Sequence, residues 1–219
     1  MTREELTREE LAGRIDYALV LPQLTDEQVV EGLQRVRQYG LPRVTVRPCD
    51  IDLAVRTLQG SSVQPNSVCA FPHGSQNTAT KLYEARDLLR RGAKGIEMVI
   101  GVSKLLSREF QHVQTELLQM AEACHKEGAT LTVMLETAYL TEELKIIACR
   151  CAERAEADFV ATSIMEDIRL LRKYVPEEVG VKAWSIGTLD QALAAIDGGA
   201  GRIECPLELL DACQKPPVE

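Results

Sequence analysis

Four ionisable residues interrupt short apolar segments of this chain. They are Asp16, Glu97, Lys182 and Glu204. A lysine amine that burial or a neighbouring cation keeps uncharged can attack a carbonyl carbon, and carboxylates can move protons. Lys182 among carboxylates therefore predicts a functional lysine of perturbed pKa, either lowered by burial or raised by pairing. A Glu97–Lys182 ion pair with a purely structural role is the alternative, and the residues alone leave both open.

The elements that must position these side chains follow a regular alternation. Strand-length apolar stretches, mostly rich in Val and Ile, alternate with amphipathic segments of helical period. The expected strands are 15–21, 43–46, 67–71, 95–100, 130–135, 158–162, 179–183 and 201–205. Expected helices begin near Thr25, Ser107, Thr141 and Thr188, and Gly40 is expected to end the first of these.

Eight strands that alternate with helices predict parallel pairing with right-handed crossovers. The even spacing and the absence of a G-x-G-x-x-G after the first strand favour a closed barrel over an open doubly wound sheet. We therefore expect an α/β protein with a single (β/α)8 TIM barrel as one domain over residues 15–219. A short capped helix is expected over residues 1–14, with Thr2 or Thr7 as its N-cap.

Chemistry in such barrels lies at the carboxyl ends of the strands and in the loops that follow. This rule selects further candidates for substrate binding besides Asp16 and Glu204. They are Arg47, His73, Glu136, Thr162, Ser163, Trp184 and Ser185. Two of them have plain structural alternatives, since His73 could be a loop residue without a role and Trp184 could be core packing.

Composition narrows the partners. A formal net charge of -8 and a pI near 5.1 argue against nucleic-acid binding. The apolar runs are too short to span a membrane. Seven cysteines without zinc-site spacing predict reduced thiols and a cytoplasmic protein, with no metal site and no cofactor expected.

Several segments resemble the deoxyribose-phosphate aldolase family in register. Segment 15–19 (Ile-Asp-Tyr-Ala-Leu) resembles Ile-Asp-His-Thr-Leu, and segment 44–48 (Val-Thr-Val-Arg-Pro) is similar to Val-Cys-Val-Asn-Pro. The resemblance continues through 70–74 (Ala-Phe-Pro-His-Gly), 92–100 (Gly-Ala-Lys-Gly-Ile-Glu-Met-Val-Ile), 135–137 (Leu-Glu-Thr), 157–160 (Ala-Asp-Phe-Val) and 180–183 (Gly-Val-Lys-Ala). Together these motifs cover nearly the whole chain to about Cys205.

The resemblance implies a class I aldolase, in which a lysine amine forms an imine with an aldehyde and the iminium accepts electrons during carbon–carbon cleavage. At the sixth strand the family reads Val-Lys-Thr-Ser, whereas this chain has Ala161 before Thr162. The resemblance assigns Lys182 to the family's neighbouring lysine and Glu97 to its proton-relay aspartate. Lys182 and Glu97 are therefore the expected catalytic residues.

The segments that correspond to the family's phosphate loop also differ. The family's Ala-Ser-Gly-Gly-Ile-Arg becomes Ala-Trp-Ser-Ile-Gly at 183–187, and Gly-Thr-Ser-Ser-Gly becomes Glu-Cys-Pro-Leu at 204–207. Fewer glycine amides and the Glu204 carboxylate disfavour a phosphate there. These changes predict that the family's standard reaction is not carried over unchanged.

Three functions remain open. The first is an aldehyde-lyase on a small aldehyde or sugar-derived substrate, with Lys182 as the amine. The second is a lyase that relies on carboxylates or on a metal held by them, and the third is an inactive barrel that serves as a binding module. The resemblance also implies a tendency to form homodimers.

Overall fold

A computed structural model describes residues 7–213 of the 219-residue chain. Its strands form one eight-stranded parallel sheet in sequence order. The strands are β1 (Asp16–Leu19), β2 (Arg43–Val46), β3 (Gln64–Cys69), β4 (Gly95–Val99), β5 (Thr130–Met134), β6 (Phe159–Thr162), β7 (Gly180–Ala183) and β8 (Arg202–Ile203). A parallel bridge between Ile15 and Ile203 joins the last strand to the first. The predicted (β/α)8 barrel is confirmed.

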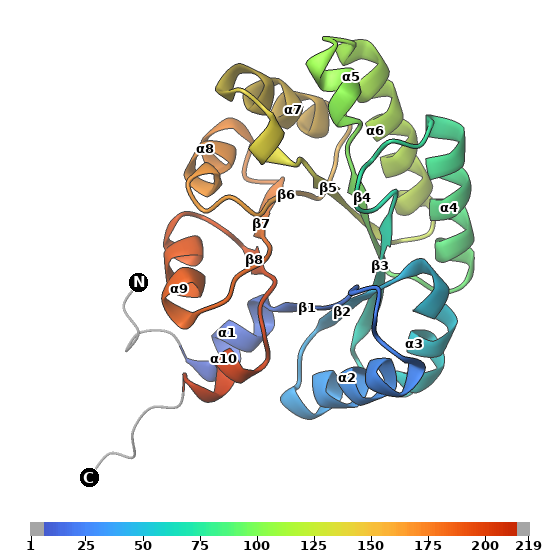
Figure 1. Cartoon of the computed structure of the whole chain (residues 1–219), viewed down its shortest axis with the longest axis vertical. Helices are drawn as coiled ribbons and strands as arrows, with labels where there is room; N and C mark the ends of the chain where they lie inside the picture. The colour runs from blue at the N-terminus through green and yellow to red at the C-terminus, as the bar shows by residue number, and fades with distance from the viewer. Residues whose placement is uncertain (1–6, 214–219) are drawn as a thin grey trace.

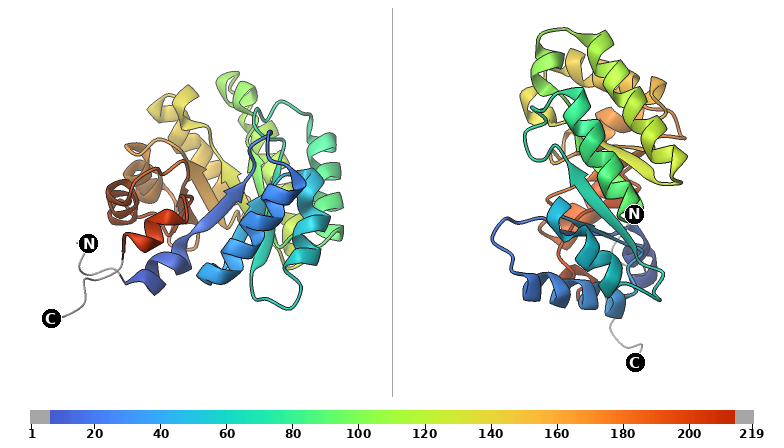
Figure 2. Two further views of the ribbon diagram at one scale, coloured as in Figure 1. Left: turned by 60° about the horizontal axis from the view of Figure 1, so that its bottom comes forward. Right: turned by 90° about the vertical axis from the view of Figure 1, so that its right-hand side faces the viewer.

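Helices surround the strands on the outside (Figure 1), and the two further views in Figure 2 show the same arrangement. The α-helices are α1 (Arg8–Arg14), α2 (Asp26–Tyr39), α3 (Ile51–Thr57), α4 (Thr78–Arg90), α5 (Val102–Leu106), α6 (Phe110–Lys126), α7 (Glu142–Arg154), α8 (Asp167–Tyr174), α9 (Leu189–Asp197) and α10 (Glu208–Asp211). Two short 3-10 helices are η1 (Pro48–Asp50) and η2 (Thr137–Tyr139). No helix between residues 7 and 213 is long and apolar enough to cross a membrane.

The predicted element boundaries hold within a few residues, with two exceptions. The third strand begins at Gln64 rather than at residue 67. Pro65 can belong to it, because a proline near the start of a strand is tolerated without its N–H. The segment after β4 was expected to hold one helix from Ser107. It holds the short α5, which ends at Leu106, and then α6 from Phe110. Part of the expected N-terminal helix, residues 1–6, lies outside the described residues.

Three helices begin with a complete capping box. The side chain of Thr7, Thr25 or Thr188 accepts a hydrogen bond from the amide of the third helical residue, whose side chain in turn accepts one from the threonine amide. Gly40 ends α2 with a φ of 68°, a left-handed conformation that favours glycine. Thr188 and its partner Gln191 cap α9 at the strand ends that carry the candidate site.

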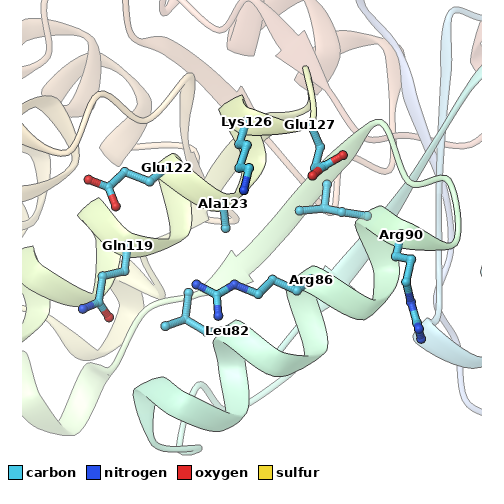
Figure 3. Close-up of a pocket in the computed structure, with 9 residues that line it drawn as sticks. Leu82, Arg86, Arg90, Gln119, Glu122, Ala123, Lys126 and Glu127 are labelled. Atoms are coloured by element: carbon cyan, nitrogen blue, oxygen red, sulfur yellow. The ribbon is translucent and has the colours of Figure 1, made fainter.

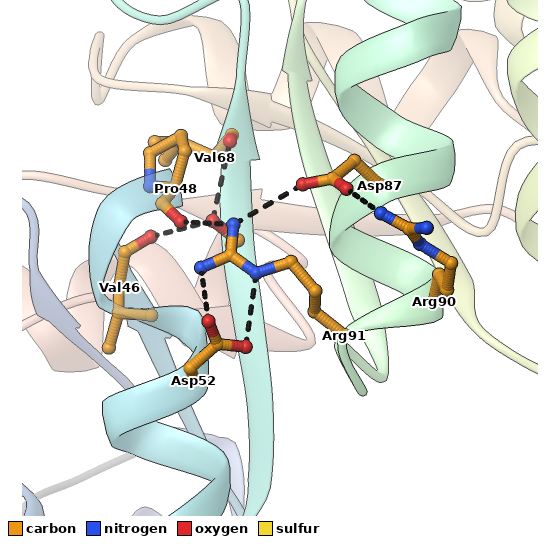
Figure 4. Close-up of polar contacts among 8 residues, drawn as sticks. Val46, Pro48, Asp52, Val68, Asp87, Arg90 and Arg91 are labelled. Atoms are coloured by element: carbon orange, nitrogen blue, oxygen red, sulfur yellow. Dashed lines mark hydrogen bonds and ion pairs between the residues drawn. The ribbon is translucent and has the colours of Figure 1, made fainter.

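Arg91, just after α4, ties the β2–α3 connection to the next helix (Figure 4). Its guanidinium donates to both carboxylate oxygens of Asp52 at 3.0 and 2.9 Å and to the Pro48 carbonyl at 3.1 Å. It also donates to Asp87 at 3.3 Å. These contacts fix the outer helices relative to each other on the side away from the barrel axis.

A second charged pair lies in the apolar layer between the barrel and its helices. Lys81 of α4 donates to Glu116 of α6 at 2.8 Å and to the Val99 carbonyl at 3.1 Å. Thr78 donates to the other Glu116 oxygen at 2.9 Å. Both charged side chains are almost fully enclosed. The pair therefore joins two helices to the end of β4.

Replacing Glu116 by Gln should destabilise the fold by about 3–5 kcal/mol, because the Lys81 ammonium would remain buried without its counter-charge. The double variant Lys81→Met/Glu116→Leu should regain most of that loss. Urea unfolding measures both effects. Lys104→Met is the matched control, because the Lys104–Glu109 pair is exposed and its loss should cost under about 1 kcal/mol. Equal losses for Glu116→Gln and Lys104→Met would contradict the expectation.

Candidate active site

The four ionisable residues that interrupt the strands come together inside the barrel, but at different depths. Lys182 lies in β7 and Glu97 in β4, whereas Glu204 directly follows β8. Asp16 is the first residue of β1 and so lies at the amino end of the barrel. The carboxyl end, where barrel chemistry is found, therefore carries Glu204 as the outermost member of this group.

Lys182 is the centre of the group. Its Nζ donates to Glu97 Oε1 at 2.7 Å and lies 3.4 Å from Asp16 Oδ2 and 3.9 Å from Glu204 Oε2. Its side chain has no exposed surface. The predicted Glu97–Lys182 pair thus exists, and two further carboxylates face the same ammonium group.

Thr45 adds a contact that the sequence did not reveal. Its Oγ1 donates to Glu97 Oε1 at 2.6 Å, the same oxygen that receives the Lys182 hydrogen bond. Thr45 lies in the middle of β2 between two valines, where its hydroxyl gives no sign of its direction. The only signal in the sequence was a polar residue inside an apolar strand, where alternate side chains face the barrel interior.

Asp16, expected to bind substrate, is enclosed at the amino end of the barrel. It accepts a hydrogen bond from Arg43 Nε, and Arg202 lies 3.9 Å from its Oδ2. Burial raises the pKa of Asp16, but the positive charges of Lys182, Arg43 and Arg202 outweigh this effect and lower its pKa overall. The structure therefore gives Asp16 the surroundings of a permanently charged support for Lys182.

The pKa values of Lys182 and Glu204 are shifted by different causes. Burial by itself lowers the pKa of Lys182, but the carboxylates of Glu97, Asp16 and Glu204 outweigh it and raise the pKa above its ordinary value. Burial raises the pKa of Glu204 to about 7, although the charge of Lys182 lowers it. Lys182 therefore holds its proton more tightly than an ordinary lysine, and Glu204 takes one up more readily than an ordinary glutamate.

Ala161 lies beside Lys182, since the two residues are paired in the register of β6 and β7. Its neighbours on the other side are apolar, because Ala161 forms a small buried cluster with Val99 and Met134 against which Phe71 and Trp184 pack. The Trp184 Nε1 atom is buried without a hydrogen-bond partner among the described residues. Trp184 therefore packs against the apolar cluster beside Ala161.

A pocket of about 360 Å³, called here the Glu204 pocket, opens at the carboxyl ends of β1, β7 and β8. Its lining includes Tyr17, Leu21, Ser185, Ile186, Glu204 and Pro206. About a fifth of the Glu204 side chain is exposed, whereas Lys182, Glu97 and Asp16 are closed off. Glu204 therefore links the buried charges to a space that a small molecule can enter.

His73 and Glu136 meet at a different pocket, of about 440 Å³, formed by the loops after β3, β4 and β5. Glu136 has a left-handed backbone (φ 51°), a conformation that costs energy in a residue other than glycine. Burial raises the pKa of Glu136 above its ordinary value, and His73 offsets only part of this effect. The two residues, expected among the substrate-binding side chains at the strand ends, line a pocket separate from the Glu204 pocket.

The remaining candidates have local partners. Arg47 donates to Asp50 at 2.6 Å and to the carbonyls of Leu21, Pro22 and Leu24, and so holds the loop after β1.

Thr162 shares a 2.7 Å hydrogen bond with Thr137 and accepts one from the Ile164 amide. Ser163 follows β6 and is half-buried, and neither Ser163 nor Thr162 lines the Glu204 pocket.

An outer groove of about 830 Å³ lies between α4 and α6, away from the strand ends (Figure 3). Arg86 from α4 and Glu122 and Lys126 from α6 line it.

Between residues 7 and 213, no group of three or more His, Cys, Asp or Glu side chains has the arrangement of a metal site.

The eight parallel strands, with a charged lysine–carboxylate group inside them and an acidic side chain at their carboxyl ends, make this protein a (β/α)8 barrel with a candidate active site. Its relatives identify the family. The chain is 37% identical over 213 residues to the deoxyribose-phosphate aldolase of Caldanaerobacter subterraneus subsp. tengcongensis, covering 93% of this chain and 92% of the relative. It is 39% identical to that of Thermococcus gammatolerans, with 89% and 91% covered.

Solved structures agree. The tetrameric deoxyribose phosphate aldolase of Aeropyrum pernix superimposes with a TM-score of 0.87 at 26% identity, covering 94% of this chain and 92% of that one. An aldolase designated QR15 gives a TM-score of 0.83 at 29% identity, with 89% and 90% covered. A comparison with models of known protein families gives no match. The chain belongs to the deoxyribose-phosphate aldolase family.

Replacing Lys182 by Met should lower the free energy of unfolding by about 3–5 kcal/mol at pH 8, because three carboxylates would then face each other without their cation. The loss should be smaller at pH 5, where the carboxylates can take up protons. Urea unfolding at both pH values measures this. An equal loss at pH 5 and pH 8 would mean that Lys182 contributes packing rather than charge.

Glu204→Gln should change the pH dependence of stability. The pKa of Glu204 is about 7 in the fold and near 4.5 in the unfolded chain, so the folded form holds its proton more tightly. Stability from this group therefore falls as pH rises from about 4.5 to about 7. Relative to wild type, Glu204→Gln should become more stable by about 1–2 kcal/mol over that range, with the estimate reduced for partial exposure. Parallel curves for the two proteins would contradict the expectation.

Proposed function

We propose that this chain is an aldehyde-lyase that makes or breaks a carbon–carbon bond in a small hydroxy-aldehyde without an imine on β6. The observation that carries the proposal is the Lys182 ammonium, held by Glu97 and connected through Glu204 to a pocket at the strand ends. Membership of the aldolase family supports the reaction class. By resemblance, Ala161 occupies the position of the imine-forming lysine, and its methyl group offers no amine.

Lys182 does not replace that lysine in the proposal. An amine attacks a carbonyl only when it is unprotonated, and the surrounding carboxylates raise the pKa of Lys182. The nearest cation that could oppose this effect in the family's arrangement is the missing lysine itself. The ammonium instead contributes a fixed positive charge behind Glu204, 3.9 Å from its Oε2, whose field acts on the Glu204 carboxylate and on the pocket beyond it.

Glu204 is suited to proton transfer, because a general base or acid works best when its pKa is close to the working pH. In cleavage, the Glu204 carboxylate takes the proton of the β-hydroxyl group. The Cα–Cβ bond then breaks, a new carbonyl forms at Cβ, and the electron pair from the broken bond forms an enolate. The same proton returns from Glu204 to Cα, which leaves a second aldehyde or ketone. Condensation runs through the same steps in reverse.

A second candidate is a barrel that binds a carbonyl compound without converting it. The enclosed position of Lys182 and the apolar cover over Ala161 favour this candidate. The two candidates share a ligand pocket and differ in turnover. They are separated by whether the protein cleaves hydroxy-aldehydes or exchanges their α-protons with solvent.

Cleavage of small aldol adducts, followed by NMR in deuterated water, should show turnover with deuterium at Cα. Glu204→Gln should lower kcat/KM by about 10²-fold or more. Glu143→Gln, an exposed carboxylate on α7, is the matched control. No cleavage and no exchange across a broad aldehyde panel would favour the binding barrel.

Borohydride trapping with small aldehydes tests the absence of an imine. Mass spectrometry should find no reduced adduct at Lys182, whereas a family member with lysine at the β6 position should give one under the same conditions. An adduct at Lys182 would overturn the role given to its ammonium.

Cellular location and assembly also belong to the proposal. The unremarkable thiol spacing and the acidic composition support a cytoplasmic protein. The family resemblance supports a homodimer, while the Aeropyrum pernix relative is tetrameric. Light scattering of the purified chain distinguishes a dimer from a tetramer.

A further inference from the structure

The Glu204 pocket is unusual in its charge. None of its lining residues is Lys, Arg or His, and the one ionisable carboxylate on its surface is Glu204. Lys182 lies 3.9 Å behind that carboxylate, but it has no exposed surface and already faces Glu97 and Asp16. Among the residues that line this pocket, an anionic ligand would therefore face a carboxylate and no cation.

Several backbone amides beside this pocket are already paired. Free amides at the first turn of a helix attract anions, and α9 begins beside this pocket. Here the amides of Gly187 and Thr188 both donate to the side-chain oxygen of Gln191, at 2.9 and 3.2 Å. The Gln191 amide donates to Thr188 Oγ1 at 3.2 Å. The capping box that begins α9, with its added Gly187 contact, thus occupies the amides of Gly187, Thr188 and Gln191.

The next amide along the loop is also paired. Ile186 donates its N–H to the backbone carbonyl of Glu204 at 3.0 Å, which joins the loop after β7 to the residue after β8. The pocket therefore offers the anion neither a lining cation nor the amides of residues 186–188.

The same lining suits an uncharged hydroxylated molecule. The Glu204 carboxylate can accept hydrogen bonds from hydroxyl groups, and Ser185 adds a hydroxyl that can donate or accept. Leu21 and Pro206 provide apolar surface for carbon–hydrogen groups.

We propose that the Glu204 pocket selects an unphosphorylated hydroxy-aldehyde and rejects its phosphate ester. This inference rests on the lyase function proposed for the same site, and it names the substrate class. The curated relatives carry a name that specifies a phosphate ester. The selectivity proposed for this chain is therefore opposite to the one their name describes.

Ligand binding, measured apart from turnover, tests the proposal. Isothermal titration or ligand-observed NMR would compare 2-deoxyribose, its 5-phosphate and inorganic phosphate on the full chain. Wild type should bind the free sugar at least about tenfold more tightly than the phosphate ester. Gln191→Ala releases the amides of Gly187 and Thr188, and Glu204→Gln removes the repelling charge. Each variant should lower the ratio of the affinity for the free sugar to the affinity for the phosphate ester. The double variant should lower that ratio further.

Gln28→Ala is the matched control, because Gln28 completes the same kind of capping box at the start of α2, away from the pocket. It should leave the ratio unchanged while costing a similar amount of stability. Equal or tighter binding of the phosphate ester by wild type would overturn the proposal, as would binding of neither sugar. A free sugar that binds with the expected preference but is never cleaved would instead remove the lyase function and leave the selectivity of the pocket intact.

Discussion

The ammonium group of Lys182 is a full charge in the interior of a barrel, and the arrangement of the strands around it depends on how that charge is compensated. Glu97 provides the short hydrogen bond, while Asp16 and Glu204 contribute from the two ends of the barrel. A charge removed from water costs several kcal/mol unless counter-charges and hydrogen bonds replace the solvent. Four strands, β1, β4, β7 and the end of β8, must therefore keep their register for this group to be satisfied.

Further charges at the amino end of the barrel compensate the carboxylates around Lys182. Arg43 and Arg202 hold Asp16 at the amino end of the barrel, and Arg202 also stacks over the Phe159 ring at 3.7 Å. Gly180 allows that ring to lie close to β7, because a Cβ atom there would approach the ring to 2.2 Å. Support from the amino end thus fixes the charge of Asp16, and this leaves Glu204 as the member of the group whose proton can exchange near neutral pH.

The same electrostatics underlie the proposal that this site does not use the imine chemistry that the family resemblance implies. A lysine needs a lowered pKa to act as a nucleophile, which a second nearby cation can produce. Here Ala161 faces Val99 and Met134, and the carboxylates around Lys182 act in the opposite direction. On this basis we propose proton transfer by Glu204 in the field of a fixed cation. None of Lys182, Glu97, Asp16 and Glu204 lines the separate pocket that holds His73 and Glu136.

Much of the fold could be read from the chain itself. The alternation of apolar strands with capped helices predicted the (β/α)8 barrel, because hydrophobic period and capping residues act locally. Thr25, Thr141 and Thr188 begin helices as expected, and Gly40 ends one. The pairing of Glu97 with Lys182 was also among the expectations, since two charges on buried strands need each other.

The tertiary structure decided which end of the barrel each side chain occupies and what surrounds it. Asp16 and Arg47 were expected at the mouth, but Asp16 supports Lys182 from the amino end and Arg47 holds a loop. The Thr45 contact with Glu97, and the separation of His73 and Glu136 from Lys182, depend on the register and stagger of strands far apart in sequence. The pKa values of Lys182 and Glu204 depend on the same placement, because they result from burial and from charges brought together only when the barrel closes.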